Sequence, residues 1–153
     1  VGMFYGAGRF DLMKMIIKYS LKTVVLFSIL SMLMFYFSAK YIVPLFTDSL
    51  EITSIAIQYF SIVCFSYPFV SIGMTSSRVM QGLGHGTPML VITLIRVVLI
   101  NAPMGYVITR ILELPIDYIW YSILVSSFIA SSISILWMKS IVKSEQNKIA
   151  PVT

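Results

Sequence analysis

The chain has 153 residues, of which 58% are hydrophobic and 11% are charged, with a mean hydropathy of +0.92 and a formal net charge of +5. Soluble domains carry about a quarter charged residues, so this composition excludes an ordinary water-soluble fold and predicts an integral membrane protein. The positive charge does not indicate nucleic-acid binding, because the basic residues lie between hydrophobic segments, where membrane topology places them.

The segment that precedes the first long apolar stretch, at about residues 8–22, has a helical pattern of its own. Lys14, Lys18 and Lys22 recur every four residues among apolar side chains. This spacing suits an amphipathic helix that lies along the cytoplasmic surface of the membrane. It suits equally a cytoplasmic extension of the first span, and both interpretations stay open at this point.

Four apolar stretches predict four membrane-spanning helices. Each has 20 or more residues, and at about 1.5 Å of rise per residue each crosses a hydrocarbon core of about 30 Å. The alternating pattern of a membrane β-barrel is absent from the sequence, so the spans are expected to be helical. We therefore predict an all-α polytopic membrane domain with spans at about residues 23–46, 52–77, 88–111 and 118–138, and a polar, fraying cytoplasmic tail at 143–153.

The distribution of Lys and Arg predicts the orientation of the spans. Eight of these residues fall before the first span, between the second and third spans, or after the fourth: Arg9, Lys14, Lys18, Lys22, Arg78, Lys139, Lys143 and Lys148. The other side carries only Lys40 and Arg110, together with Asp48, Glu51, Glu113 and Asp117. By the positive-inside rule, both ends of the chain are predicted to be cytoplasmic.

The sequence QGLGHGTP between the second and third spans is rich in glycine. A phosphate-binding loop would need the Walker lysine and a preceding strand, and both are missing. We interpret the sequence as a tight turn, in which glycines supply positive φ and Pro88 begins the next helix. No second His, Cys or acid is near His85 in the sequence, so we expect His85 to be a solvated turn residue rather than a ligand.

Polar residues and prolines inside the spans are the candidates for a transport cavity. Arg96 is costly in hydrocarbon, so it either faces a cavity or extends toward the lipid headgroups, and the sequence leaves both open. Pro68 and Pro103 are expected to kink their helices. The candidate cavity residues are Tyr59, Ser66, Tyr67, Met74, Arg96 and Asn101, whereas no Asp or Glu lies within any predicted span.

The last span carries small residues at every fourth position: Ser122, Ser126, Ala130 and Ser134. This spacing places them along one helix face, where small side chains allow two helix backbones to approach closely. We predict that this face packs against protein and that the opposite face, with Leu124, Phe128 and Ile135, is better suited to lipid. One Cys, one His and scattered acids form no metal site or catalytic triad, so the sequence does not indicate an enzyme.

Several segments in the same order resemble the multidrug and toxic compound extrusion (MATE) transporters. They are VGMFYGAGRFD at the start, PLFTD at the end of the first span, SSRVMQGLGHGTPM after the second, and IRVVLINAPMGYVI and IDYIWYSILVSS in the last two. The resemblance implies part of a twelve-helix transporter with two six-helix lobes, of which this chain matches the last four helices. It also implies a multi-pass protein of the plasma membrane that exchanges Na⁺ or H⁺ for organic, often cationic, compounds by alternating access.

The resemblance also implies which partners to expect. They are the bilayer, a small organic substrate and the missing N-terminal remainder of the transporter; no cofactor beyond the coupling ion is expected. The chain begins with Val1 rather than Met, which also favours a truncation. Two alternatives stay open: a self-contained, oligomeric four-helix membrane protein with a channel-like or structural role, and a flippase for lipid-linked substrates from the same superfamily.

Overall fold

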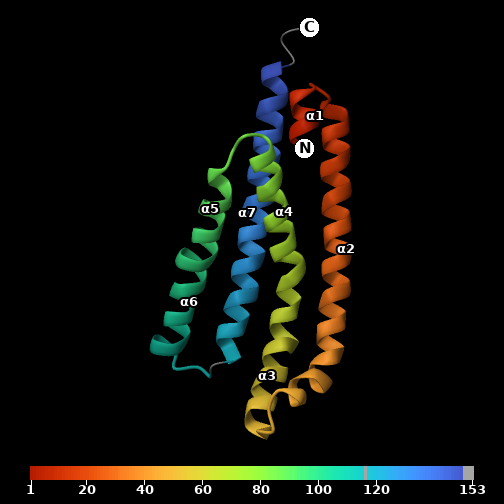
Figure 1. The fold of residues 1–153 in the computed structure, drawn as a ribbon. Coiled ribbons are helices and arrows are strands. Elements are labelled where there is room, and N and C mark those ends of the chain that lie inside the picture. The colour runs from red at the N-terminus through yellow and green to blue at the C-terminus, as the bar shows by residue number, and fades with distance from the viewer. Residues whose placement is uncertain (116, 150–153) are drawn as a thin grey trace.

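The computed structural model describes residues 1–115 and 117–149. Its elements are α1 (Gly2–Gly6), α2 (Phe10–Ile42), η1 (Val43–Leu45), α3 (Leu50–Val63), η2 (Cys64–Ser66), α4 (Tyr67–Gly82), α5 (Thr87–Leu94), η3 (Ile95–Asn101), α6 (Ala102–Tyr106), η4 (Val107–Ile111) and α7 (Asp117–Ile149). Within the described residues these form four apolar helical segments long enough to cross a membrane, Phe10–Leu45, Leu50–Gly82, Thr87–Ile111 and Asp117–Lys148. The segments run up and down side by side, and short α1 lies against one end (Figure 1).

The first and fourth helical segments extend furthest beyond their predicted spans, and the second also continues five residues further, to Gly82. Residues 8–22 do not form a separate surface helix, because Phe10–Ile42 is a single continuous helix. Of the two interpretations, the structure therefore favours an extension of the first span over a separate surface helix. At the other end of the chain, α7 continues to Ile149 instead of fraying from 143, and residues 150–153 of the predicted tail lie outside the described part.

Regular α-helix is interrupted beside each intramembrane proline. The second segment changes to a short 3₁₀ turn, η2, and Pro68 then lies in the first turn of α4. The third segment contains the π-helical stretches η3 and η4 on either side of α6, and Pro103 lies in the first turn of α6. A proline has no N–H to donate, so it leaves a carbonyl in the preceding turn without its usual partner and favours such irregular turns.

The glycine-rich turn between α4 and α5 has the form that the sequence predicts. Gly84 has a φ of +88°, and the His85 N–H donates to the Met80 carbonyl at 3.0 Å. Pro88 lies in the first turn of α5. Gly82 and Gly86 differ from the prediction, because neither has a positive φ. The close approach of α1 to this turn depends on Gly2, since a Cβ on Gly2 would lie 3.1 Å from the Gly82 carbonyl oxygen.

The second long segment lies at the centre of the bundle. Its α4 part packs against α2 on one side and α7 on the other. On α7, all four residues of the predicted small-residue face, Ser122, Ser126, Ala130 and Ser134, are buried. The Ser134 hydroxyl donates to the Gly73 carbonyl at 3.1 Å, and a Cβ on Gly73 would lie 3.8 Å from the Ser131 Cα. The prediction that this face packs against protein is therefore confirmed.

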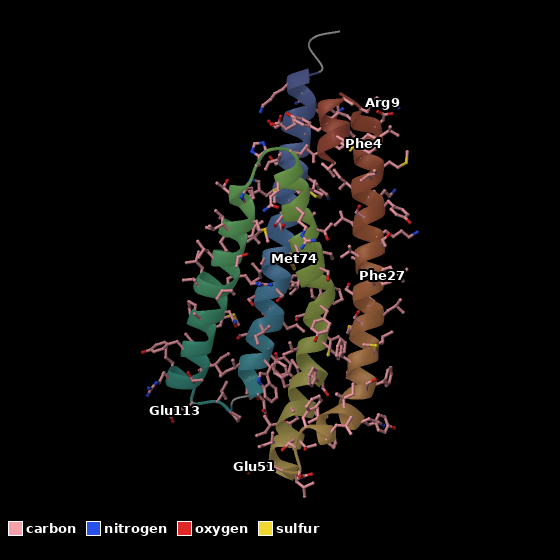
Figure 2. The ribbon with its side chains drawn as sticks, in the orientation of Figure 1. Phe4, Arg9, Phe27, Glu51, Met74 and Glu113 are labelled. Atoms are coloured by element: carbon pink, nitrogen blue, oxygen red, sulfur yellow. The ribbon has the colours of Figure 1, made fainter. Side chains whose placement is uncertain are left out.

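The opposite side of α7 is more mixed than the sequence suggests. Phe128 is exposed, as expected for a side chain that faces lipid, but Leu124 and Ile135 are only half-exposed. The Phe128 ring also packs edge-on against Phe69 of α4, with 5.3 Å between ring centroids. The exposed apolar side chains along the other long helices suit a bilayer (Figure 2).

Basic and acidic residues lie mostly at opposite ends of the bundle, as their order in the sequence predicts. The N-terminus, the C-terminal end of α7 and the turn between α4 and α5 lie at one end of the bundle, near Arg9 (Figures 1 and 2). Glu51, in the first turn of α3, and Glu113, after η4, lie at the opposite end. The bundle therefore has one predominantly basic end and one predominantly acidic end.

Candidate functional site

Two of the candidate residues, Met74 and Arg96, meet at a small cavity between the second, third and fourth helical segments. Arg96 reaches it from η3, Met74 and Ser77 from α4, and Ser127 and Ser131 from α7. The cavity measures about 40 Å³. A space of this size accommodates ordered water rather than a drug-sized molecule.

The polar side chains that line this cavity are one arginine, Arg96, and several residues with hydroxyl groups. The hydroxyls of Ser77, Ser127 and Ser131 each donate to a carbonyl of their own helix, at 2.9, 2.7 and 2.9 Å respectively. Their oxygens keep acceptor capacity for the guanidinium of Arg96, which carries five N–H donors and stays charged. Arg96 thus lies on the cavity wall, and whether its side chain faces the cavity or extends toward the headgroups stays open.

Ser66 and Tyr67 lie at a different place, a groove of about 330 Å³ between α2 and the second segment. Ser28 and Ser31 of α2 form its other wall. Ser66 is buried and donates to the Val63 carbonyl at 2.7 Å, and the Tyr67 ring packs edge-on against Phe35. These two residues therefore line a groove that is separate from the cavity at Arg96.

Tyr59 and Asn101 both contact α7. The Tyr59 ring packs perpendicular to the buried Trp120 ring, with 5.9 Å between centroids. The Asn101 side-chain oxygen accepts a hydrogen bond from the Ser122 hydroxyl at 2.7 Å. The six candidate residues thus do not converge on one cavity in the described residues, because successive positions along a helix of 3.6 residues per turn face different neighbours.

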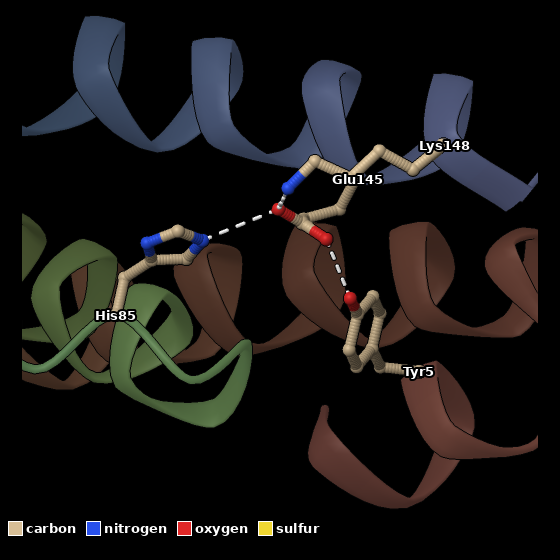
Figure 3. A network of polar contacts seen from close by, with 4 residues as sticks. All are labelled: Tyr5, His85, Glu145 and Lys148. Carbon is tan, nitrogen blue, oxygen red and sulfur yellow. Dashed lines mark hydrogen bonds and ion pairs between the residues drawn. The ribbon is translucent and has the colours of Figure 1, made fainter.

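A polar cluster that the sequence analysis missed lies at the basic end of the bundle, around Glu145 of α7 (Figure 3). One carboxylate oxygen accepts a hydrogen bond from the Tyr5 hydroxyl of α1 at 2.5 Å. The other lies 2.6 Å from the Lys148 ammonium and 3.3 Å from the His85 ring. Glu145 is only 4% exposed, so this buried carboxylate joins α1, the turn before α5 and α7.

The His85 side chain is 41% exposed, in line with a solvated turn residue, but its ring also lies beside the Glu145 carboxylate, which its sequence neighbours did not indicate. Tyr5, His85 and Glu145 are far apart in the sequence, and only the fold brings them together. The hydrogen bond to the Glu145 carboxylate raises the pKa of the Tyr5 phenol above its usual value, with burial as a smaller cause. The phenol therefore keeps its proton at neutral pH and remains a donor.

Comparisons with known proteins place the chain in a family. The family model described as MatE matches residues 1–107. The chain belongs to the MatE family. Among curated protein sequences, no match is found.

Solved structures of MatE-type transporters share the fold. The chain superposes on a multidrug resistance MATE family transporter of the MOP superfamily, in an inward-facing conformation, with a TM-score of 0.89 and 18% identity, over 97% of this chain and 34% of that one. The Vibrio cholerae MATE transporter VcmN in its bent form superposes with a TM-score of 0.82 and 22% identity, over 93% of this chain and 32% of VcmN. A MOP superfamily transporter from Pyrococcus furiosus superposes with a TM-score of 0.87 and 20% identity, over 95% of this chain and 33% of that transporter.

These similarities confirm the predicted fold class, a multi-pass all-α membrane protein with four helices of MATE type. The chain spans about a third of the length of the transporters that it matches. The MatE family match ends within η4, so α7, with Glu145 and the small-residue face, lies beyond it.

Proposed function

We propose that the chain supplies four helices of a secondary-active multidrug efflux transporter of the plasma membrane, which exchanges Na⁺ or H⁺ for organic, often cationic, compounds by alternating access. The observation that carries this proposal is that nearly the whole chain superposes on MATE transporters while it belongs to the MatE family. The same likeness disfavours a self-contained four-helix channel, because the four helices correspond to a third of a larger fold.

The distribution of charge supports a cytoplasmic location for both ends of the chain. The end of the bundle that holds the N-terminus and the C-terminal end of α7 is predominantly basic, and such ends stay in the cytoplasm. The coupling group is expected from elsewhere in the transporter. Na⁺ or H⁺ coupling typically uses an intramembrane carboxylate, and the four predicted spans of this sequence contain none.

Arg96 favours a second candidate function, the transport of an anionic or lipid-linked substrate. Its side chain supplies a positive charge on the wall of a water-sized cavity, and a positive charge suits a phosphate or carboxylate better than a cation. The similar transporter from Pyrococcus furiosus is likewise described as having a binding pocket of reverse polarity, which suggests a different function for that protein. A transport assay distinguishes the two candidate functions.

The test is transport by the protein produced from its complete reading frame in proteoliposomes, with Na⁺ or H⁺ gradients imposed separately. We expect one gradient to drive movement of the cationic dye ethidium, and Arg96→Gln to change the rate at least fivefold. Arg78→Gln, which removes an exposed arginine at the basic end, should leave the rate within twofold. The 153-residue chain alone should insert without transporting.

The outcomes separate the two candidates cleanly. If an anionic dye moves in place of ethidium and Arg96→Gln abolishes that movement, the second candidate replaces the first. If neither gradient drives either dye, the exchange mechanism is wrong.

A further inference from the structure

A groove at the basic end of the bundle lies between the first turns of α2 and the last turns of α7. Both helices pack on α4 but make little contact with one another. The groove that remains between them measures about 610 Å³. This volume is within the range of sites that bind small molecules, unlike the cavity at Arg96.

The two walls of the groove repeat the same pattern. On α2, Lys14 and Lys18 are four residues apart, with Ile17 and Leu21 beside them; on α7, Lys139 and Lys143 are four residues apart, with Met138 and Val142 beside them. Residues four apart share a helix face, so each wall combines a pair of lysines with a pair of apolar side chains.

Four lysines around one groove repel one another. Like charges at four-residue spacing destabilise a helix, and here two such pairs face the same space. The remaining lining residues, Gln146 and Asn147, are uncharged, so no acid of the described residues lines the groove. Lys14 donates to the Gln146 side chain at 2.5 Å, which leaves its charge uncompensated. An anion would relieve this repulsion.

The groove lies where a membrane lipid can enter it. The helical segment Phe10–Leu45 has 36 residues and is therefore about 54 Å long, well beyond a hydrocarbon core of about 30 Å. The predicted first span begins near residue 23, so Lys14, Lys18 and Leu21 lie at the level of the headgroups. Ile17 and Met138, at the floor of the groove, are buried.

We propose that this groove binds an anionic phospholipid of the cytoplasmic leaflet. The headgroup phosphate lies among Lys14, Lys18, Lys139 and Lys143, and the start of an acyl chain lies along Ile17, Leu21, Met138 and Val142. Basic pockets between membrane helices on the cytoplasmic side bind anionic headgroups in this way. The apolar floor favours a lipid over free phosphate, because free phosphate has no apolar part that could pack against these side chains.

The test is native mass spectrometry of the protein produced from its complete reading frame, with dioleoyl phosphatidylglycerol or dioleoyl phosphatidylcholine added. We expect at least fivefold higher occupancy by the anionic lipid. The double variant Lys18→Gln/Lys143→Gln should weaken its binding by about 25-fold, since each lysine near an anionic headgroup contributes about fivefold. The matched control Lys22→Gln/Lys40→Gln removes the same charge outside the groove and should stay within twofold.

A second measurement uses the wild-type protein and so does not depend on how the variants fold. A phosphatidylglycerol with a photoreactive acyl chain should crosslink to residues 17–21 and 138–142, and millimolar glycerol phosphate should not displace it. The proposal would be overturned by equal occupancy of the two lipids, or by an equal loss of lipid binding in both double variants. It would also be overturned if glycerol phosphate displaced the lipid, or if crosslinks spread over the exposed side of η3.

Discussion

Replacing Ala130 with leucine is expected to lower the melting temperature of the protein in detergent by about 3–10 °C. Ala130 is 3% exposed and belongs to a buried cluster with residues from α2, α4, α5 and α7. Leucine adds three carbon atoms, more than the adjoining cavity of about 40 Å³ can accept without moving a helix. Overpacking of this kind costs about 1–3 kcal/mol in soluble cores, and about 1 kcal/mol shifts the melting temperature of a chain this long by about 2–4 °C.

Ala102→Leu is the matched control for this prediction. It adds the same side chain to an exposed position at the start of α6, where lipid can make room. Its melting temperature should stay within about 1 °C of the parent. If Ala130→Leu melts like the parent while Ala102→Leu melts lower, the faces assigned to protein and lipid are reversed.

Replacing Glu145 with glutamine is expected to release α1 from the bundle. A neutral amide oxygen is a weaker acceptor than the carboxylate for the Tyr5 hydroxyl, the Lys148 ammonium and the His85 ring, and the amide NH₂ offers a donor where donors already converge. Hydrogen exchange of the backbone at residues 2–8 and 83–87 should become at least tenfold faster.

Two further variants show whether the effect belongs to Glu145. Lys148→Gln removes only the exposed partner and should change exchange at residues 2–8 less than threefold. Glu113→Gln removes an acid at the opposite end of the bundle and should have no effect there. Unchanged exchange in Glu145→Gln would mean that α1 is held by apolar packing alone, through Phe4 and Tyr5.

Much of the fold could be predicted from the sequence because the bilayer restricts the choices. Apolar runs of 20 or more residues must be helical in lipid, so composition and length sufficed for the four spans. The close packing of Ala130 and its serine neighbours followed from their four-residue spacing alone. The extent of α2 and α7 beyond the spans did not follow, because polar residues continue a helix as readily as they end it.

The candidate sites were harder to predict, because they depend on contacts between distant segments. The apolar stretches place Arg96 and Met74 inside their predicted spans, but they do not indicate that the two residues line the same cavity. Glu145 looked like part of a polar tail, since nothing local connects it to Tyr5 or His85. One signal was available: an acid with a lysine three residues later, on a helix whose preceding turns carry other lysines.

The measurement that tests the central claim most directly is the sidedness of the four-span bundle. In a Cys64→Ala background, single cysteines at Asp48, Gly86 and Ser144 occupy exposed positions at the two ends. With a membrane-impermeant maleimide on intact cells, Asp48→Cys should be labelled, whereas Gly86→Cys and Ser144→Cys should react only after permeabilisation. The reverse pattern, or labelling of Gly86→Cys and Ser144→Cys from opposite sides, would contradict a MATE-type segment with both ends in the cytoplasm.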